Sequence, residues 1–209
     1  MNLLTAANLG ALAQQRLIEE GGMKVGIAGC TGVVGQRFVS LLLGTAGEEQ
    51  ADGSISTASQ KPHPYFRIAA LSASARSAGQ EYQHACAWRI SSAMPTAART
   101  MPVLPTTVEA FVAAGVQLVF SALDADVATE FEWSLAKAGI VVFSNARSHR
   151  TGLRVPILVP HANSEHIHII STQQAAEGFP QTGFIVTNAN CSSTGLVVAL
   201  RVRAATSYM

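Results

Sequence analysis

The feature that most constrains the fold is a glycine-rich turn between a short apolar strand and an apolar helix. Residues 24–29 read KVGIAG, glycines stand at positions 29, 32 and 35, and an apolar helical stretch covers 33–43. Such a turn lets the backbone approach a pyrophosphate, and the helix that follows points its N–H groups and positive dipole end at the anion. A tight turn without a ligand is the alternative. The context predicts a nucleotide-binding turn formed by Gly29, Thr31, Gly32, Val33, Val34 and Gly35.

The rest of the first two thirds of the chain repeats the alternation of strand and helix. Further strands are predicted at 67–71, 117–121 and 140–144. Helices are predicted from Thr106 or Thr107 to Ala114, and from Asp124 to Ala138 with Gly139 as the terminator. This alternation predicts an α/β fold, a Rossmann-like doubly wound parallel sheet.

The pattern changes near Pro156, where prolines and histidines interrupt it. A further strand is expected at 184–187, and a helix opens at Cys191. We expect an N-terminal extension at 1–22 and an NADP-binding Rossmann-like domain at 23–157, with a mobile insertion at 44–64. Residues 158–209 are expected to begin an incomplete α+β catalytic domain.

Composition excludes several classes of function. Hydrophobic residues make up 48% of the 209 residues and charged residues 13%, which is apolar enough for a core, and the net charge of +1 without a basic stripe argues against nucleic acid. No apolar run approaches the ~20 residues that cross a bilayer. Cys30, Cys86 and Cys191 lie far apart, which argues against a metal site and favours a reducing, cytoplasmic compartment.

A second motif follows the strand at 67–71. Proteins that bind NAD usually place a carboxylate here to hold the ribose 2′-hydroxyl, but no Asp or Glu lies between Arg67 and Gln80. Hydroxyls and a guanidinium suit a 2′-phosphate instead, so NADP is favoured over NAD. A solvated loop with an exposed arginine is the alternative. The residues predicted to bind this phosphate are Ser72, Ser74, Arg76 and Ser77.

A third motif surrounds the last cysteine. Cys191 falls in the first turn of the expected helix, where the helix end stabilises negative charge and favours a thiolate nucleophile. A buried, inert cysteine is the alternative. The polar neighbours Asn188, Asn190 and Ser192 favour the nucleophile, because such residues cap helices and bind anions.

Together these motifs resemble the aspartate-semialdehyde dehydrogenases, in particular their archaeal and fungal branch. The resemblance runs from about Met23 to Leu200. The matching stretches are GIAGCTGVVGQRFVSLL, AALSASARSAGQEY, LVFSALDADVA, AGIVVFSNARSHR and FIVTNANCSSTGLVVAL.

The resemblance implies the NADP-dependent conversion of aspartyl-4-phosphate to aspartate 4-semialdehyde through a cysteine thioacyl intermediate. Cys191 would be the nucleophile, Asn190 would orient the acyl group or phosphate, and Arg150 would bind the substrate phosphate. Ser121 and Ala122 would lie beside the nucleotide, with Asn145 near its nicotinamide end. The implied partners are a small acyl phosphate, the semialdehyde and inorganic phosphate, with neither nucleic acid nor membrane. The family is homo-oligomeric, but its interface would be largely missing from this chain.

The chain departs from the family pattern at four places. Asp124 and Ala189 stand where the family usually has proline, and His161 stands where it has a carboxylate. After Leu200 the resemblance ends, whereas family members continue with the general-acid/base histidine and the arginine that holds the substrate carboxylate. We therefore expect a truncated chain with weak or no activity, and six histidines that lie on the surface or in loops.

Two other functions remain open. The chain is also compatible with an NADP-binding module without turnover, or with an acyl reductase that resembles malonyl-CoA reductase. N-Acetyl-glutamyl-phosphate reductases share the fold but place a Gly-Cys-Tyr type sequence at the nucleophile, which Asn190-Cys191-Ser192 does not match.

Overall fold

The computed structural model describes residues 17–44 and 61–206, with only the backbone of 202–206. The predicted extension at 1–22 and the predicted insertion at 44–64 lie mostly outside the described residues, and the domain boundary near residue 157 stays a prediction. The strands are β1 (Met23–Ala28), β2 (Phe66–Ala73), β3 (Val103–Pro105), β4 (Leu118–Ser121), β5 (Val141–Ser144), β6 (Ile157–Leu158) and β7 (Phe184–Asn188).

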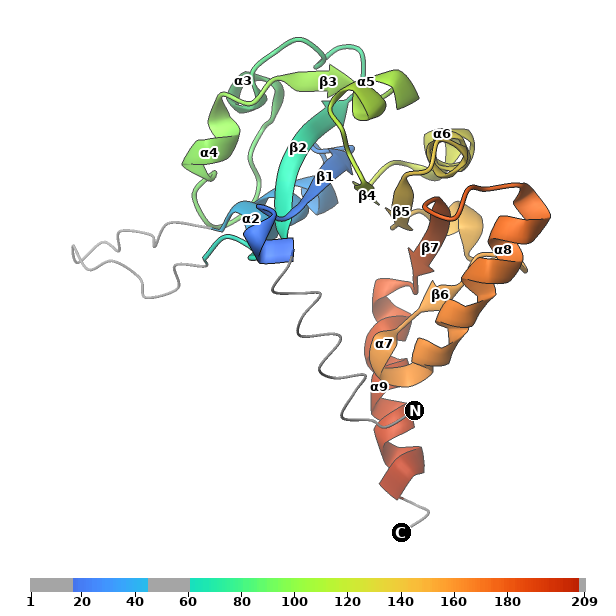
Figure 1. Cartoon of the computed structure of the whole chain (residues 1–209). Coiled ribbons are helices and arrows are strands. Elements are labelled where there is room, and N and C mark those ends of the chain that lie inside the picture. The colour runs from blue at the N-terminus through green and yellow to red at the C-terminus, as the bar shows by residue number, and fades with distance from the viewer. Residues whose placement is uncertain (1–16, 45–60, 207–209) are drawn as a thin grey trace, which may run out of the picture. The chain divides into compact units, whose positions relative to one another are not determined.

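Helices occupy the connections between these strands (Figure 1). The α-helices are α2 (Val33–Leu43), α3 (Tyr82–Ala85), α4 (Thr96–Arg99), α5 (Val108–Ala113), α6 (Ala125–Lys137), α7 (Pro160–Asn163), α8 (Ile169–Glu177) and α9 (Cys191–Thr206). Two 3-10 turns, η1 (Arg147–His149) and η2 (Ser164–His168), complete the set. None of the helices within the described ranges combines the length and apolarity needed to span a bilayer.

The strands form one sheet in the order β3-β2-β1-β4-β5-β7-β6. Strand β1 runs parallel to β2, β2 to β3, β5 to β7, and β6 to β7. Each parallel step requires a crossover connection, which the helices supply. The predicted α/β fold with a Rossmann-like parallel sheet is confirmed.

The chain divides into two compact units, residues 1–118 and 119–209. In the first unit β1 and β2 are both largely buried, and Val25 and Ile27 of β1 are 0% exposed. Helix α2 packs on β1 and β2, and its buried face includes Val39 and Leu42. The apolar face thus formed fixes the position of the glycine turn that joins β1 to α2.

In the second unit β7 lies between β5 and β6. Helices α6 and α8 both pack against β7. Gln173 of α8 is 0% exposed, accepts a hydrogen bond from the Ile185 N–H at 2.8 Å and donates to the Arg154 carbonyl at 2.9 Å. One buried amide therefore joins α8, β7 and the loop that precedes β6.

Candidate functional site

Glycine is required at two positions of the turn after β1. Gly29 has φ +77°, in the left-handed region that disfavours any side chain. A Cβ at Gly35 would lie 2.2 Å from the Gly29 carbonyl oxygen, so only glycine lets α2 start this close to the turn. A Cβ at Gly32 would meet nothing nearer than 3.5 Å. The turn therefore has the close helix–strand approach that nucleotide-binding turns use.

Two buried polar side chains, neither predicted as a site residue, hold this turn in shape. Gln36, 1% exposed, donates to the Thr31 carbonyl at 2.8 Å and to the Ala87 carbonyl at 3.1 Å. The Tyr82 hydroxyl donates to the Cys30 carbonyl at 2.7 Å. The sequence offered a sign that Gln36 is buried, because it lies on the same face of the helix as Val39 and Ser40.

The first turn of α2 is open to a ligand. Val33 and Val34 are 52% and 43% exposed, an unusual state for valines that directly follow a buried strand and turn. The helix begins after Gly32 without a side-chain cap. Because the first N–H groups of a helix have no intrahelical partner, they are available here to an oxyanion. The geometry fits a bound pyrophosphate.

The serine-rich loop after β2 divides into an exposed and a buried part. Ser74 and Arg76 are exposed and Ser77 is half-buried, with the Ser77 N–H bonded to the Ser74 carbonyl at 2.9 Å. Ser72 instead lies inside β2, 0% exposed, with its hydroxyl 3.1 Å from that of Thr106. Phosphate binding by all four residues stays a prediction, and the three outside the strand are accessible to a ligand.

Two of the three cysteines are buried in the first unit. Burial raises the pKa of Cys30 to about 12, and the neighbouring Cys86 adds to the effect. Burial likewise raises the pKa of Cys86 and of Tyr82. These groups stay protonated at neutral pH and are shielded from reagents, which excludes them as nucleophiles.

The polar groups of the second unit gather at two neighbouring strand ends. Register pairs Ser144 of β5 with Thr187 of β7, so Asn145 and Asn188 follow at the carboxyl ends of adjacent parallel strands. Their side chains are joined, with Asn188 Nδ2 donating to Asn145 Oδ1 at 2.5 Å. Ligands of open α/β sheets bind outside the carboxyl ends of the strands. Asn188 was not predicted as a site residue, although it follows a strand just as Asn145 does.

Arg150 is tied to both of these strand ends. Its Nε donates to the Asn188 carbonyl at 3.1 Å, and its Nη2 donates to the Asn145 carbonyl at 3.0 Å. Within the described part of the chain, Nη1 has no hydrogen-bond partner. The guanidinium is half-buried and held in place, and its two Nη1 N–H groups remain free to donate. It can therefore bind a phosphate or a carboxylate.

Cys191 is exposed at the first residue of α9. Asn190 caps the helix, because its Oδ1 accepts the Ser192 N–H at 3.0 Å and its carbonyl accepts the Thr194 N–H at 2.9 Å. The Cys191 Sγ lies 3.6 Å from the same Asn190 Oδ1. The sulfur thus faces an open helix end beside an amide that also orders the first turn.

The remaining predicted positions lie at the end of β4. Ser121 is 0% exposed, and its hydroxyl has no hydrogen-bond partner among the described residues. Its carbonyl accepts the Asn145 N–H at 2.9 Å. Ala122 follows, half-buried. Their predicted place beside a nucleotide stays a prediction.

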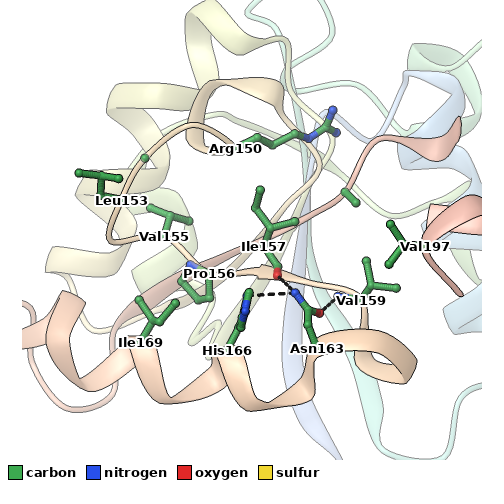
Figure 2. A pocket seen from close by; sticks show the side chains of 12 residues that line it. Arg150, Leu153, Val155, Pro156, Ile157, Val159, Asn163, His166, Ile169 and Val197 are labelled. Atoms are coloured by element: carbon green, nitrogen blue, oxygen red, sulfur yellow. Dashed lines mark hydrogen bonds between the residues drawn. The ribbon is translucent and has the colours of Figure 1, made fainter. Parts of the chain in front are cut away.

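A pocket of about 370 Å³ lies beside Arg150 (Figure 2). Its wall is mostly apolar and includes Val155, Ile157 and Val197. Asn163 lies at its edge, donating to the Ile157 carbonyl at 2.8 Å and lying 3.0 Å from His166 Nδ1. No cluster of three His, Cys, Asp or Glu that could hold a metal occurs in residues 17–44 or 61–206.

One histidine departs from expectation. His149 was expected on the surface or in a loop. It lies in the short η1 turn but is 5% exposed, with its Nε2 2.8 Å from Glu132 Oε2. It is buried because α6 places Trp133 and Glu132 over the η1 turn, and the ring stacks on Trp133 at 5.7 Å between centroids. A buried histidine paired with a distant residue leaves no local sequence pattern.

The parallel sheet and the glycine turn define an α/β protein of the nucleotide-binding, Rossmann-like class. Residues 53–170 match the family model described as semialdehyde dehydrogenase, NAD binding domain. The chain therefore belongs to the semialdehyde dehydrogenase family, and the resemblance seen in its motifs is confirmed.

Named relatives agree with this assignment. The chain is 43% identical to an aspartate-semialdehyde dehydrogenase of Cryptococcus neoformans and 36% identical to one of Archaeoglobus fulgidus, in each case over 85% of this chain but only 44% and 45% of the relative. It is also similar to the crystal structure of the Candida albicans enzyme with NADP, with TM-score 0.69 and 37% identity over 86% of this chain and 46% of that one. The chain thus spans less than half the length of these relatives.

Proposed function

We propose that this chain carries the cofactor-binding part and the nucleophile of an NADP-dependent aspartate-semialdehyde dehydrogenase. The observation that carries the proposal is the exposed Cys191 at a capped helix start, three residues after the Asn188 that anchors Arg150. A nucleophile and an anion-binding guanidinium held at adjacent strand ends suit an acyl phosphate. The named relatives favour the aspartyl substrate over a malonyl thioester.

The chemistry assigned to this chain begins with the Cys191 thiolate. Its sulfur attacks the acyl carbon of aspartyl-4-phosphate, a carbon–sulfur bond forms, and the carbon–oxygen bond to phosphate breaks with its electron pair on the departing phosphate. Arg150 Nη1 donates to that phosphate, while Asn190 Oδ1 orders the helix start around the sulfur. The leaving anion is thus stabilised by a cation already in place.

NADPH, when bound, supplies the hydride that reduces the thioacyl group to the semialdehyde. The glycine turn would hold its pyrophosphate, because the first N–H groups of α2 have no intrahelical partner and Gly35 lets this helix start close to the turn. The exposed Ser74 and Arg76, with the half-buried Ser77, would hold the 2′-phosphate, in a loop that offers no competing carboxylate. The relative of known structure is described with NADP.

The proposed partners are therefore small molecules: the acyl phosphate, the semialdehyde, inorganic phosphate and the dinucleotide. A cytoplasmic location and self-association belong to the same proposal, since both come from the family. They are separate from the assignment of the nucleophile and can fail without it.

The test is acylation of the chain by aspartyl-4-phosphate without nucleotide. Intact-protein mass spectrometry should show one aspartyl adduct that hydroxylamine removes, and peptide mapping should place it on Cys191. Cys191→Ala should remain unmodified, and Arg150→Ala should acylate about 10–100-fold more slowly because the leaving phosphate loses its cation. An adduct on Cys30 or Cys86, or no adduct on a folded wild-type chain, contradicts the proposal.

A further inference from the structure

A buried pair of polar side chains directly precedes Arg150. His149 and Glu132 are 5% and 0% exposed, and their Nε2 and Oε2 atoms lie 2.8 Å apart. His149 is the last residue of η1, and Arg150 caps that turn, with its N–H bonded to the Arg147 carbonyl at 3.1 Å. The pair therefore connects α6 to the residue that directly precedes Arg150.

Net stability does not explain the pair. Glu132 lies on the buried face of α6 with Ala128, Leu135 and Ala136. Its contact with His149 has the length but not the direction of a hydrogen bond, and among the described residues neither Glu132 oxygen has a hydrogen-bond partner. Burying a carboxylate in this state is costly, and apolar side chains of similar volume are often at least as stable. A buried group retained at such a cost needs another role.

Arg150 is restrained at both of its ends. Its backbone belongs to the η1 turn that His149 holds on α6, and the His149 carbonyl also accepts the Gly152 N–H at 3.1 Å. Its guanidinium is fixed to the Asn145 and Asn188 carbonyls. Because successive Cα atoms are only ~3.8 Å apart, a shift of the His149 backbone also displaces the backbone of Arg150. The bonds to both strand ends would then lengthen together.

We propose that His149 and Glu132 are positioning residues that hold the η1 turn in the one orientation from which Arg150 reaches both strand ends. In that orientation the two N–H groups of Nη1 already point toward the position of the incoming oxyanion. The role rests on the proposed function, in which that oxyanion is the substrate phosphate. Neither side chain touches the phosphate, since both are buried behind the turn.

The test compares an apolar replacement with a conservative one in the full chain. His149→Phe combined with Glu132→Leu keeps the ring on Trp133 and removes the polar contact, whereas Glu132→Gln keeps the shape and a polar partner. Two readouts are the hydrogen-exchange rate of the Arg150 Nε–H in ¹⁵N spectra, assigned by its loss in Arg150→Lys, and the affinity for inorganic phosphate. Thermal unfolding is recorded in parallel.

The double variant should keep its thermal transition, exchange the Arg150 Nε–H about tenfold faster and bind phosphate about fivefold more weakly, the effect of about one hydrogen bond. Glu132→Gln should stay within about twofold of wild type in both. An unchanged exchange rate in a folded double variant overturns the proposal. If the double variant does not fold, Glu132→Asp, which withdraws the carboxylate by one methylene, must raise the exchange rate, and an unchanged rate overturns it. Failure of the wild type to bind phosphate counts against the proposed function, while the exchange rates still decide the positioning role.

Discussion

The three cysteines show how far local environment separates chemically identical residues. Cys30 and Cys86 are 0% and 6% exposed, with their pKa values raised by burial, whereas Cys191 is exposed at a helix start. The sequence predicted this division for Cys191 because a strand followed by a polar cap and an apolar helix is a local pattern. The sequence could not show that Cys30 and Cys86 are neighbours in the fold, because they stand 56 positions apart along the chain.

Cys191 should therefore be the first cysteine to react with a soluble alkylating agent. In a short iodoacetamide pulse below pH 8, peptide mapping should find Cys191 modified while Cys30 and Cys86 remain unmodified. Of the three thiols, only that of Cys191 is accessible and lies at a positive helix end. The same pulse on urea-unfolded protein is the control and should label all three. Protection of Cys191 in the folded sample would remove it as the nucleophile.

Gly35 should tolerate no side chain, whereas Gly32 should tolerate one. Gly35→Ala places a Cβ 2.2 Å from a backbone oxygen, while the equivalent contact for Gly32→Ala is an ordinary 3.5 Å. We expect Gly35→Ala to lower the free energy of unfolding by about 2–4 kcal/mol and Gly32→Ala by less than about 1 kcal/mol. Urea titration of the two variants measures the difference, and equal losses would show that α2 can move away from the turn.

At the scale of elements, the sequence predicted best where periodicity is strong. The helix predicted over 33–43 matches α2. Of the two threonines predicted as possible caps of the next helix, Thr106 and Thr107, it is Thr107 that caps α5, because its Oγ1 accepts the Ala110 N–H at 3.3 Å. The three-residue β3 and the helix α8 were missed. Strand β3 is too short to show a period, and the buried side of α8 is a hydrogen-bonding glutamine, Gln173, where an apolar residue would have given a signal.

The burial of Cys30, where α3 contacts the glycine turn, should make the free energy of unfolding fall at alkaline pH. The folded chain holds the pKa of Cys30 at about 12, against an ordinary value of 9.0, so above pH 9 the unfolded chain loses a proton that the folded chain keeps. Stability should thus be fully present below pH 9 and fall by about 1.4 kcal/mol by pH 10 from this thiol alone. The raised pKa of Tyr82 adds to the loss above pH 10.

Urea titration between pH 8 and pH 10 measures this loss. Cys30→Ala should make the profile shallower over that interval, because only the buried Cys86 thiol then contributes to the loss. A slope that is the same in wild type and Cys30→Ala would show that the thiol is not shielded.

For the whole molecule, the sequence predicted the class of fold and the three motifs but not what supports them. The glycine turn, the serine-rich loop and Cys191 are local patterns. The side chains of Gln36 and Asn188, which brace the glycine turn and the strand ends beside Cys191, bond to partners distant in the sequence, and no single stretch reveals such pairs. The function proposed for the whole chain requires that these motifs bind a 2′-phosphorylated dinucleotide and present a cysteine nucleophile.

Calorimetric titration with NADPH and NADH measures the preference for the 2′-phosphate. NADPH should bind at least about tenfold more tightly, and Arg76→Ala should remove most of this preference, because one charge-assisted contact to the 2′-phosphate contributes about 1.5–3 kcal/mol. Arg37→Ala, at another exposed arginine outside the serine-rich loop, is the control and should keep the preference. Equal affinity of the wild-type chain for the two dinucleotides, or no binding of either, would show that the serine-rich loop does not bind a 2′-phosphate.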